Sequence, residues 1–390
     1  MDKLLSDARE EFANIFGEEA EFYGRGPGRV EILGNHTDYN DGFALSAAID
    51  RSLIVAGRPV EGDAAKVYSL TFKSGTSFSV ARPEAAKEAP WLNYVMAMVW
   101  RLSGLGHNPG AFEAVIAGDV PLGAGLSSSA ALEMAAGHFF KAMTGFEMSP
   151  LDMALNGRAA ENEFVGVQCG ILDQWSSAMG REDRLLLLDC RKLEVVDYPE
   201  LPGSVELVIA DTNAPHALVD GEYNRRRESC FRAAEVCAKR FPERGITHLR
   251  DVSLAELEAC CDELSDVDFR RARHIVNENT RALAGAEALK TGDVATLGRL
   301  MSDSHESSRK DFENSGPELD LMVDAAVGLP GCYGSRLSGG GFGGVTVNLV
   351  ESSAVEEFAA ELKSRYQRKS HLEAVIHRLR PTAGASGGKF

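Results

Sequence analysis

Short apolar runs alternate with longer amphipathic stretches along this chain of 390 residues. Each run is rich in Val, Ile and Leu and is bounded by Gly, Pro or Asp, which is typical of strands. The predicted strands cover residues 51–60, 111–118, 183–190, 205–211 and 344–350. Residues 149–164 repeat apolar positions at helical spacing, with Ser149 as N-cap and Pro150 at the first helical position. Residues 225–326 are mostly helical in pattern, so the chain as a whole predicts an α/β fold.

The length of the chain exceeds that of one average hydrophobic core and fits two domains. The composition changes near LPGS, residues 201–204, where the alternating pattern gives way to long charged helical segments. We therefore predict an N-terminal domain over residues 1–203 and a C-terminal domain over residues 204–390.

Charge and cysteine content narrow the class of ligand. Lys and Arg number 41 against 58 Asp and Glu, a formal net charge of -17, which disfavours a nucleic-acid binder or a protein that coats anionic membranes. The longest apolar stretch, residues 95–100, ends at Arg101, and the acidic, amphipathic N-terminus has no apolar leader segment. Seven cysteines without framework spacing indicate reduced thiols. We expect a cytoplasmic protein with small-molecule ligands.

The stretch GRVEILGNHTDYNDG, residues 28–42, follows a short predicted strand and places polar side chains between glycines. Its glycines allow close backbone approach to a ligand, and Asn35, His36, Asp38 and Tyr39 supply hydrogen-bond donors and acceptors for a hydroxyl-rich molecule. A surface turn would explain the same residues.

Residues 121–140, PLGAGLSSSAALEMAAGHFF, form a glycine and serine loop that leads directly into a helix. Such a loop directs free N–H groups and the positive end of the helix dipole at one point, which suits a polyphosphate, and serine hydroxyls add ligands for phosphate or Mg²⁺. The alternative is a flexible turn capped by serine. The loop matches neither GxxxxGK[ST] nor GxGxxG.

Two further stretches combine glycine with reactive side chains. Residues 160–175 place Glu161, Glu163 and Asp173 around a tight turn, where Asp173 suits a general base or simply a helix cap. Residues 335–350 carry five glycines in six positions before a strand, which allows close approach to a ligand or to a second loop, or marks a bulged strand entry.

Taken together and in this order, these stretches resemble the GHMP small-molecule kinases, and within them the galactokinases. Residues 211–227 and 304–320 match two more motifs of the family, so the resemblance spans nearly the whole chain. It implies an α+β fold with two domains, the first similar to ribosomal protein S5 and the second ferredoxin-like, with the active site in the cleft between them.

The resemblance also implies roles for individual residues. Asp173 matches the aspartate that faces the anomeric hydroxyl, as proton acceptor or as electrostatic stabiliser, and Arg29 matches its arginine partner. Ser129 and Glu161 match the Mg²⁺ site. The positions that would line the path of the ATP phosphates are Gly123, Gly125, Ser127, Ser128 and Ser129.

The sugar-contacting positions of the family correspond here to His36, Asp38, Gly170 and Tyr223. Galactokinases usually carry glutamate at the position of Asn35, which resembles the residue that reads the C6 hydroxyl. The resemblance implies an ATP-dependent sugar 1-kinase acting on galactose. Because Asn35 lacks the charge of glutamate, galacturonate, L-arabinose and N-acetylgalactosamine are alternative substrates, and we expect broad tolerance at C6.

Two other functions are compatible with the fold. A galactokinase-like sensor would bind sugar and ATP without turnover, but Arg29, Ser129 and Asp173 are all present. A kinase for mevalonate or homoserine is disfavoured because HTDYN and GEYNRRR resemble the sugar branch. Beyond sugar and ATP we expect neither nucleic acid nor a membrane as a partner, and we expect a monomer, with an oligomer as the open alternative.

Overall fold

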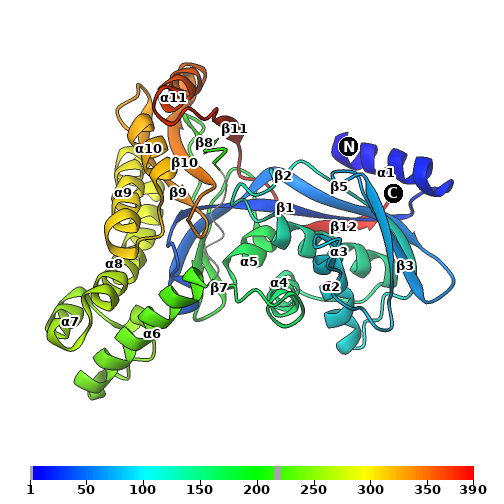
Figure 1. Cartoon of the computed structure of the whole chain (residues 1–390), viewed down its shortest axis with the longest axis horizontal. Helices are drawn as coiled ribbons and strands as arrows, with labels where there is room; N and C mark the ends of the chain where they lie inside the picture. The colour runs from blue at the N-terminus through cyan, green and yellow to red at the C-terminus, as the bar shows by residue number, and fades with distance from the viewer. Residues whose placement is uncertain (1–2, 215–220) are drawn as a thin grey trace.

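The chain folds around two β-sheets that lie side by side (Figure 1), as seen in a computed structural model that describes residues 3–214 and 221–390. Within these residues the first sheet has the order β12-β1-β2-β5-β3-β4, and β6 and β7 extend it from β2. Its strands are β1 (Phe22–Leu33), β2 (Phe43–Pro59), β3 (Ala64–Ser69), β4 (Ser74–Ser79), β5 (Phe112–Gly118), β6 (Leu186–Asp189), β7 (Glu194–Asp197) and β12 (Ser386–Lys389).

Helices cover both faces of the first sheet. The helix α1 (Lys3–Phe16) packs Ala8 and Phe12 on one face, against Ile54 and Val115. The other face carries α2 (Leu92–Gly104), α3 (Ser128–Thr144), α4 (Pro150–Ala160) and α5 (Leu172–Met179). The central strands β1, β2 and β5 are therefore buried on both sides, and the strand residues that face α3 set its distance from β1.

Glycines in β1 let α3 approach the strand closely. A Cβ atom at Gly24 would lie 2.0 Å from the carbonyl oxygen of Ala135, and one at Gly26 would lie 2.0 Å from that of Ala131. No larger residue fits at either position without moving α3. This close packing places the first turn of α3, and the loop before it, directly beside the end of β1.

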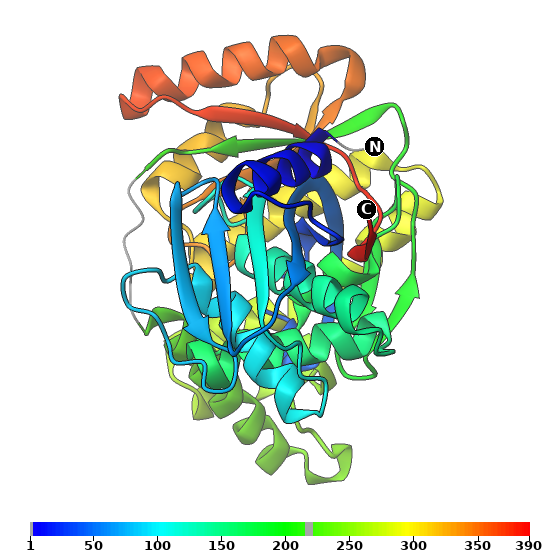
Figure 2. The ribbon, with the colours of Figure 1, turned by 90° about the vertical axis from the view of Figure 1, so that its right-hand side faces the viewer.

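The second sheet has the antiparallel order β11-β8-β10-β9 within the described residues. Its strands are β8 (Val205–Asp211), β9 (Cys332–Ser338), β10 (Val345–Glu351) and β11 (Val375–Leu379). The helix α11 (Val355–Ser370) lies across β8 and β11 (Figure 2) and shares a core with α10 (Pro317–Ala326). With one crossover helical region before β9 and one helix before β11, this order is that of a ferredoxin-like unit.

The segment between β8 and β9 is mostly helical. It contains α6 (Glu222–Arg240), α7 (Leu254–Ala259), α8 (Asp266–Lys290), α9 (Val294–Ser307) and α10. The helices α6, α7 and α8 enclose a small core of their own, which includes Cys230, Leu257 and Ile275. The two sheets and their covering helices agree with the α+β architecture expected from the sequence.

Each predicted strand is present in the structure, and the predicted helix over 149–164 is α4 followed by a single π-helical turn at Glu161–Val165. The Ser149 side chain accepts the predicted N-cap hydrogen bond, from the Asp152 N–H at 3.1 Å. The interpretation of residues 28–42 as a stretch that follows a short strand needs correction, because residues 28–33 lie inside β1 and only residues 34–42 form the turn. Strand pairing extends β1 further than its polar residues suggest.

The domain division at residue 203 stays a prediction. Residues 386–389 lie far beyond that boundary, yet they form β12 and pair with β1 in the first sheet. All seven cysteines are free thiols. Among the described helices, none is long and apolar enough to cross a membrane.

Candidate active site

A cavity of about 390 Å³ lies where the two sheets meet. Its wall comes from the end of β1, the turn after it, the loop before α5, the start of α6 and the glycine loop after β9. The cavity therefore gathers four of the six motifs of the sequence, including Tyr223 from residues 211–227, of which residues 215–220 lie outside the described residues. Its volume suits a single small ligand.

Asp173 and Arg29 form an ion pair at one side of the cavity. The Arg29 Nε donates to Asp173 Oδ1 at 2.7 Å, and a second guanidinium nitrogen lies 2.6 Å from the same oxygen. The other carboxylate oxygen, Oδ2, accepts a hydrogen bond from the Ser127 hydroxyl. Arg29 is 5% exposed and the Asp173 side chain is 29% exposed, so the arginine is shielded from bulk water while the carboxylate stays open to the cavity.

The glycine and serine loop before α3 closes over this pair. The Arg29 guanidinium also donates to the Gly125 carbonyl at 2.7 Å. Gly125 packs against the second glycine loop, because a Cβ there would lie 3.1 Å from the Ser338 carbonyl oxygen. Ser128 and Ser129 form the first turn of α3, where N–H groups are free to bind an anion, and Gly123 lies exposed at the tip of the loop.

Glu161 lies next to this loop in a cluster of buried acids. The Gln174 side-chain amide donates to Glu161 at 2.7 Å and to Glu133, on α3, at 2.9 Å. Burial raises the pKa of the Glu161 carboxyl to about 7, and hydrogen bonds from Cys169, Gln174 and Ser129 oppose this rise. Burial likewise holds the pKa of Glu133 well above its usual range.

This cluster has the oxygen-rich character that Mg²⁺ prefers. Glu133 Oε1 and Gln174 Oε1 are buried without a hydrogen-bond partner, and both belong to residues that surround Glu161. The described residues contain no group of three His, Cys, Asp or Glu side chains able to hold a metal alone. Mg²⁺ usually takes one or two carboxylates together with substrate phosphates, so the residues present fit that ion as an ATP complex.

His36 and Tyr223 form an aromatic wall of the cavity. Their ring centroids lie 5.1 Å apart, and the His36 Nδ1 pairs with the Tyr39 hydroxyl at 2.9 Å. Burial lowers the pKa of His36 to about 3, so the ring is neutral. Its Nε2 lies 3.2 Å from the Gly340 carbonyl oxygen, so Nε2 carries the proton and Nδ1 accepts from Tyr39.

Asp38 and Gly170 lie directly against each other in the wall of the cavity. A Cβ atom at Gly170 would lie 1.6 Å from Asp38 Oδ2, so only glycine leaves room for the carboxylate. Burial, with the charges of Asp173 and Glu31, raises the pKa of Asp38 to about 6. Asp38 is thus a carboxylate in a polar but desolvated position, ready to accept hydrogen bonds from a ligand.

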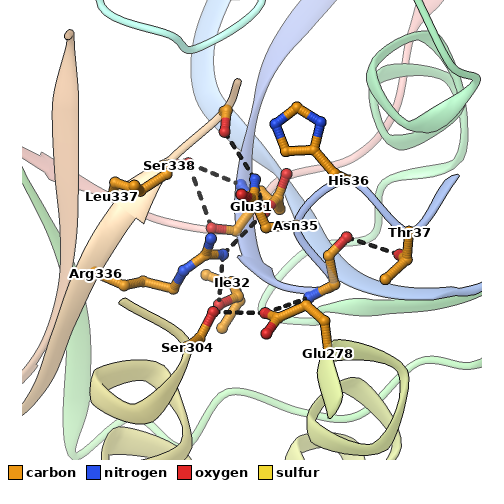
Figure 3. Close-up of polar contacts among 12 residues, drawn as sticks. Glu31, Ile32, Asn35, His36, Thr37, Glu278, Ser304, Arg336, Leu337 and Ser338 are labelled. Atoms are coloured by element: carbon orange, nitrogen blue, oxygen red, sulfur yellow. Dashed lines mark hydrogen bonds and ion pairs between the residues drawn. The ribbon is translucent and has the colours of Figure 1, made fainter. Parts of the chain in front are cut away.

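Asn35 lines the cavity but is already engaged by neighbours (Figure 3). Its Nδ2 donates to Glu31 Oε1 at 2.9 Å and to the Gly339 carbonyl at 2.8 Å. Its Oδ1 accepts from the Asn314 side chain at 2.8 Å. Both Asn35 donors are therefore used before any ligand binds.

The residues expected at the site lie together, but four residues that lie beside them were not expected there. Glu31, Arg336, Asn314 and Glu133 were not predicted to lie at the site. Glu31 stood inside a quoted motif and alternates with Arg29 along β1, and side chains two apart on a strand share a face. That spacing was the signal available for Glu31; for the other residues, only the packing of the two sheets reveals their place.

Known protein families match three parts of the chain. The galactokinase galactose-binding signature matches residues 10–59, the GHMP kinases N terminal domain matches residues 93–181, and the GHMP kinases C terminal matches residues 286–368. The first contains the turn with Asn35, and the second contains both the phosphate-type loop and Asp173.

Two relatives that match nearly the whole chain are both named galactokinase. A galactokinase from Roseiflexus sp. (strain RS-1) is 44% identical over 97% of this chain and 96% of its own length. A galactokinase from Chloroflexus aggregans is 40% identical, with 93% of this chain and 92% of the relative covered. Among solved structures, Lactococcus lactis galactokinase complexed with galactose matches with a TM-score of 0.92 and 32% identity, over 98% of this chain and 99% of that one.

Proposed function

This chain belongs to the galactokinase family of the GHMP kinases and is a sugar kinase, and from that premise we propose that it phosphorylates the anomeric hydroxyl of galactose in the cavity beside Asp173. The observation that carries the proposal is the position of the Asp173 carboxylate. One oxygen pairs with Arg29, and the other pairs with Ser127 of the phosphate loop. Asp173 thus lies between the expected phosphate path and the cavity.

Asp173 orients the anomeric hydroxyl and accepts its proton as the phosphoryl group transfers. Because the transition state of phosphoryl transfer is loose, the attacking oxygen needs little activation, and positioning and charge stabilisation account for most of the rate acceleration. Arg29 holds the aspartate in place and offers its guanidinium to the transferring group. Burial of Arg29 strengthens both interactions, since solvent screens them little.

ATP binds through its phosphates to the loop before α3. Gly123, Gly125, Ser127 and Ser128 line the path, and the N–H groups at the start of α3 face the phosphates. A Mg²⁺ ion held by Ser129 and Glu161 would neutralise charge on those phosphates. The Gln174 side-chain amide, which donates to both Glu161 and Glu133, keeps the Glu161 carboxylate in place.

The sugar is held by the polar residues of the cavity. Asp38 accepts hydrogen bonds from two neighbouring ring hydroxyls, and Gly170 leaves the room for its carboxylate. His36 and Tyr223 pack against the ring as an aromatic wall.

Coupled measurement of ADP release with a panel of free sugars tests the function. We expect turnover that depends on both galactose and Mg²⁺, with product phosphorylated at C1. The alternative of a non-catalytic sensor would be favoured by galactose binding, measured by calorimetry, without any galactose-stimulated ADP release. Retention of the Arg29–Asp173 pair argues against the sensor.

A further inference from the structure

A second carboxylate, that of Glu31, lines the same cavity as Asp173 and has no part in the function proposed above. Glu31 is 3% exposed, so its small accessible area faces the cavity. Two donors converge on its Oε1: Asn35 Nδ2 at 2.9 Å and Arg336 Nη1 at 2.9 Å (Figure 3). Burial raises the pKa of the Glu31 carboxyl, and the charges of Arg336 and Arg29 with the hydrogen bonds from Arg336 and Asn35 oppose this rise. The direct ion pair with the Arg336 guanidinium favours the ionised carboxylate.

The second oxygen of Glu31 remains available. Within the described residues, the side-chain hydrogen bonds to this carboxylate are made to Oε1. Oε2 does not belong to the atoms that are both fully buried and unpaired, so it keeps some accessible surface. An acceptor that is accessible at a cavity wall binds a donor from the ligand. Asn35 cannot supply a donor in its place, because both of its N–H groups are engaged.

The position of Glu31 defines which part of a sugar it meets. Arg29 and Glu31 lie on the same face of β1, two residues apart, which separates them by about 7 Å along the strand. A hexose whose anomeric hydroxyl lies at the Arg29–Asp173 pair therefore extends a substituent distant from the reacting centre toward Glu31. Asn35, at the position that resembles the C6 reader of galactokinases, contacts Glu31 directly.

We propose that Glu31 is a specificity-determining residue that reads the C6 hydroxyl of the sugar, with Asn35 and Arg336 holding its carboxylate in place. This rests on the proposed function and revises the broad C6 tolerance expected from Asn35 alone. The cavity therefore has a negative charge at this end, but Glu31 on β1 carries it and the turn residue Asn35 does not. Galacturonate, with a C6 carboxylate, meets a like charge, and L-arabinose leaves Glu31 Oε2 without its donor.

The test compares kcat/KM for galactose, galacturonate and L-arabinose in the natural chain and in Glu31→Gln. We expect the natural chain to prefer galactose over each of the other sugars by at least about tenfold, the value of one charge-assisted hydrogen bond. Glu31→Gln is expected to lower the galactose to galacturonate ratio by at least about tenfold. Comparable use of galacturonate by the natural chain, or an unchanged ratio in Glu31→Gln, would overturn the proposal.

A matched control separates specificity from stability, since Glu31→Gln also removes the partner of a buried arginine. Glu278 is a buried carboxylate of the same polar cluster that accepts from Ser304 at 2.5 Å and does not line the cavity. We expect Glu278→Gln to lower the midpoint of thermal unfolding while leaving the sugar ratios unchanged. Altered ratios in Glu278→Gln would assign the effect to the cluster as a whole and overturn the specific role of Glu31.

Exchange of Glu31 and Asn35 gives an independent test, because the double variant keeps one carboxylate at this end of the cavity. Asn35→Glu alone places two carboxylates at hydrogen-bonding distance and is expected to weaken galactose binding. The double variant Glu31→Asn with Asn35→Glu is expected to recover galactose selectivity relative to either single change. Additive losses in the double variant would contradict a shared role.

Sugar binding, measured by calorimetry, keeps this inference separate from the proposed function. Galactose binding that is tighter than galacturonate binding, and that loses this preference in Glu31→Gln, supports the role of Glu31 even if no sugar is phosphorylated. Absence of turnover with all sugars would instead count against the kinase function alone. Equal affinity for both sugars would overturn the role of Glu31 whatever the turnover.

Discussion

The Ser127 hydroxyl donates a hydrogen bond to the Asp173 carboxylate from a left-handed backbone position, with φ 56° and ψ 54°. A non-glycine residue in this conformation costs about 1–2 kcal/mol, so the loop holds strain at the point where it contacts the acid. The phosphate loop and the carboxylate are thus coupled through one side chain.

Two substitutions at Ser127 separate strain from hydrogen bonding. Ser127→Ala keeps the strain and removes the hydrogen bond, whereas Ser127→Gly removes both. We expect Ser127→Gly to be the more stable of the two by up to about 1 kcal/mol, and both to lose turnover by a similar factor of about 3–10. Urea unfolding and steady-state kinetics measure these effects; equal stability of the two variants would show that the loop relaxes.

Asp173→Asn is expected to lower turnover by about 10²–10⁴ while galactose and ATP still bind, because the amide keeps the shape of the carboxylate but cannot accept the proton. Calorimetry for binding and coupled assays for turnover measure the two effects. Asp324→Asn serves as control and should leave turnover unchanged, because Asp324 lies on α10 in an ion pair with Arg309. Near-normal turnover of Asp173→Asn would remove this residue from the chemistry.

Asp38 makes stability and sugar binding depend on pH in opposite directions. Its pKa is raised from 3.8 to about 6 in the folded protein, so the stability that it contributes is present below pH 3.8 and is lost as the pH rises through 6. A rise of about 2 pKa units corresponds to up to about 3 kcal/mol. Asp38→Asn should therefore be more stable than the natural chain at about pH 8, with a smaller difference at about pH 4.

Galactose binding to the natural chain should weaken below about pH 6, because protonated Asp38 loses an acceptor. Asp38→Asn should bind galactose weakly at every pH. Urea unfolding of the sugar-free protein and calorimetry with galactose measure the two trends. A galactose affinity that does not change between about pH 5 and about pH 8 would contradict the role of the carboxylate.

Gly170→Ala is expected to raise KM for galactose by at least about tenfold and to change KM for ATP little. The added Cβ would lie 1.6 Å from Asp38 Oδ2 and would push the carboxylate away from the ring hydroxyls. Gly203→Ala, where a Cβ meets no atom within 4 Å, is the matched control and should behave as the natural chain. Equal changes in both KM values would place Gly170 outside the sugar site.

Ser129→Ala and Glu161→Ala are expected to raise the Mg²⁺ concentration needed for half-maximal turnover more than they raise KM for galactose. Both side chains are assigned to the ion, and each substitution removes an oxygen ligand. Ser149→Ala, at the exposed N-cap of α4, is the control, since it weakens the helix without facing the loop. Parallel shifts for Mg²⁺ and galactose in both variants would contradict the assignment.

The sequence alone determined the elements whose signals are local. The strands β5, β8 and β10 follow from runs of Val, Ile and Leu, and the start of α4 follows from Ser149 and Pro150, because period and capping depend on neighbouring residues. The motifs also determined the family, since each catalytic residue is embedded in a short recognisable stretch.

The tertiary structure alone decided how these stretches support one another. Glu31, Asn314 and Arg336 come from a strand of one sheet, a segment after a helix and a strand of the other sheet, and they meet only because the two sheets pack together. The return of residues 386–389 to β1 has the same origin. Asn35 read alone suggested a missing charge at the sugar. The Glu31 carboxylate lies only four residues away, but the long-range contacts of Arg336 and Asn314 that hold this pair at the cavity leave no periodic trace in the chain.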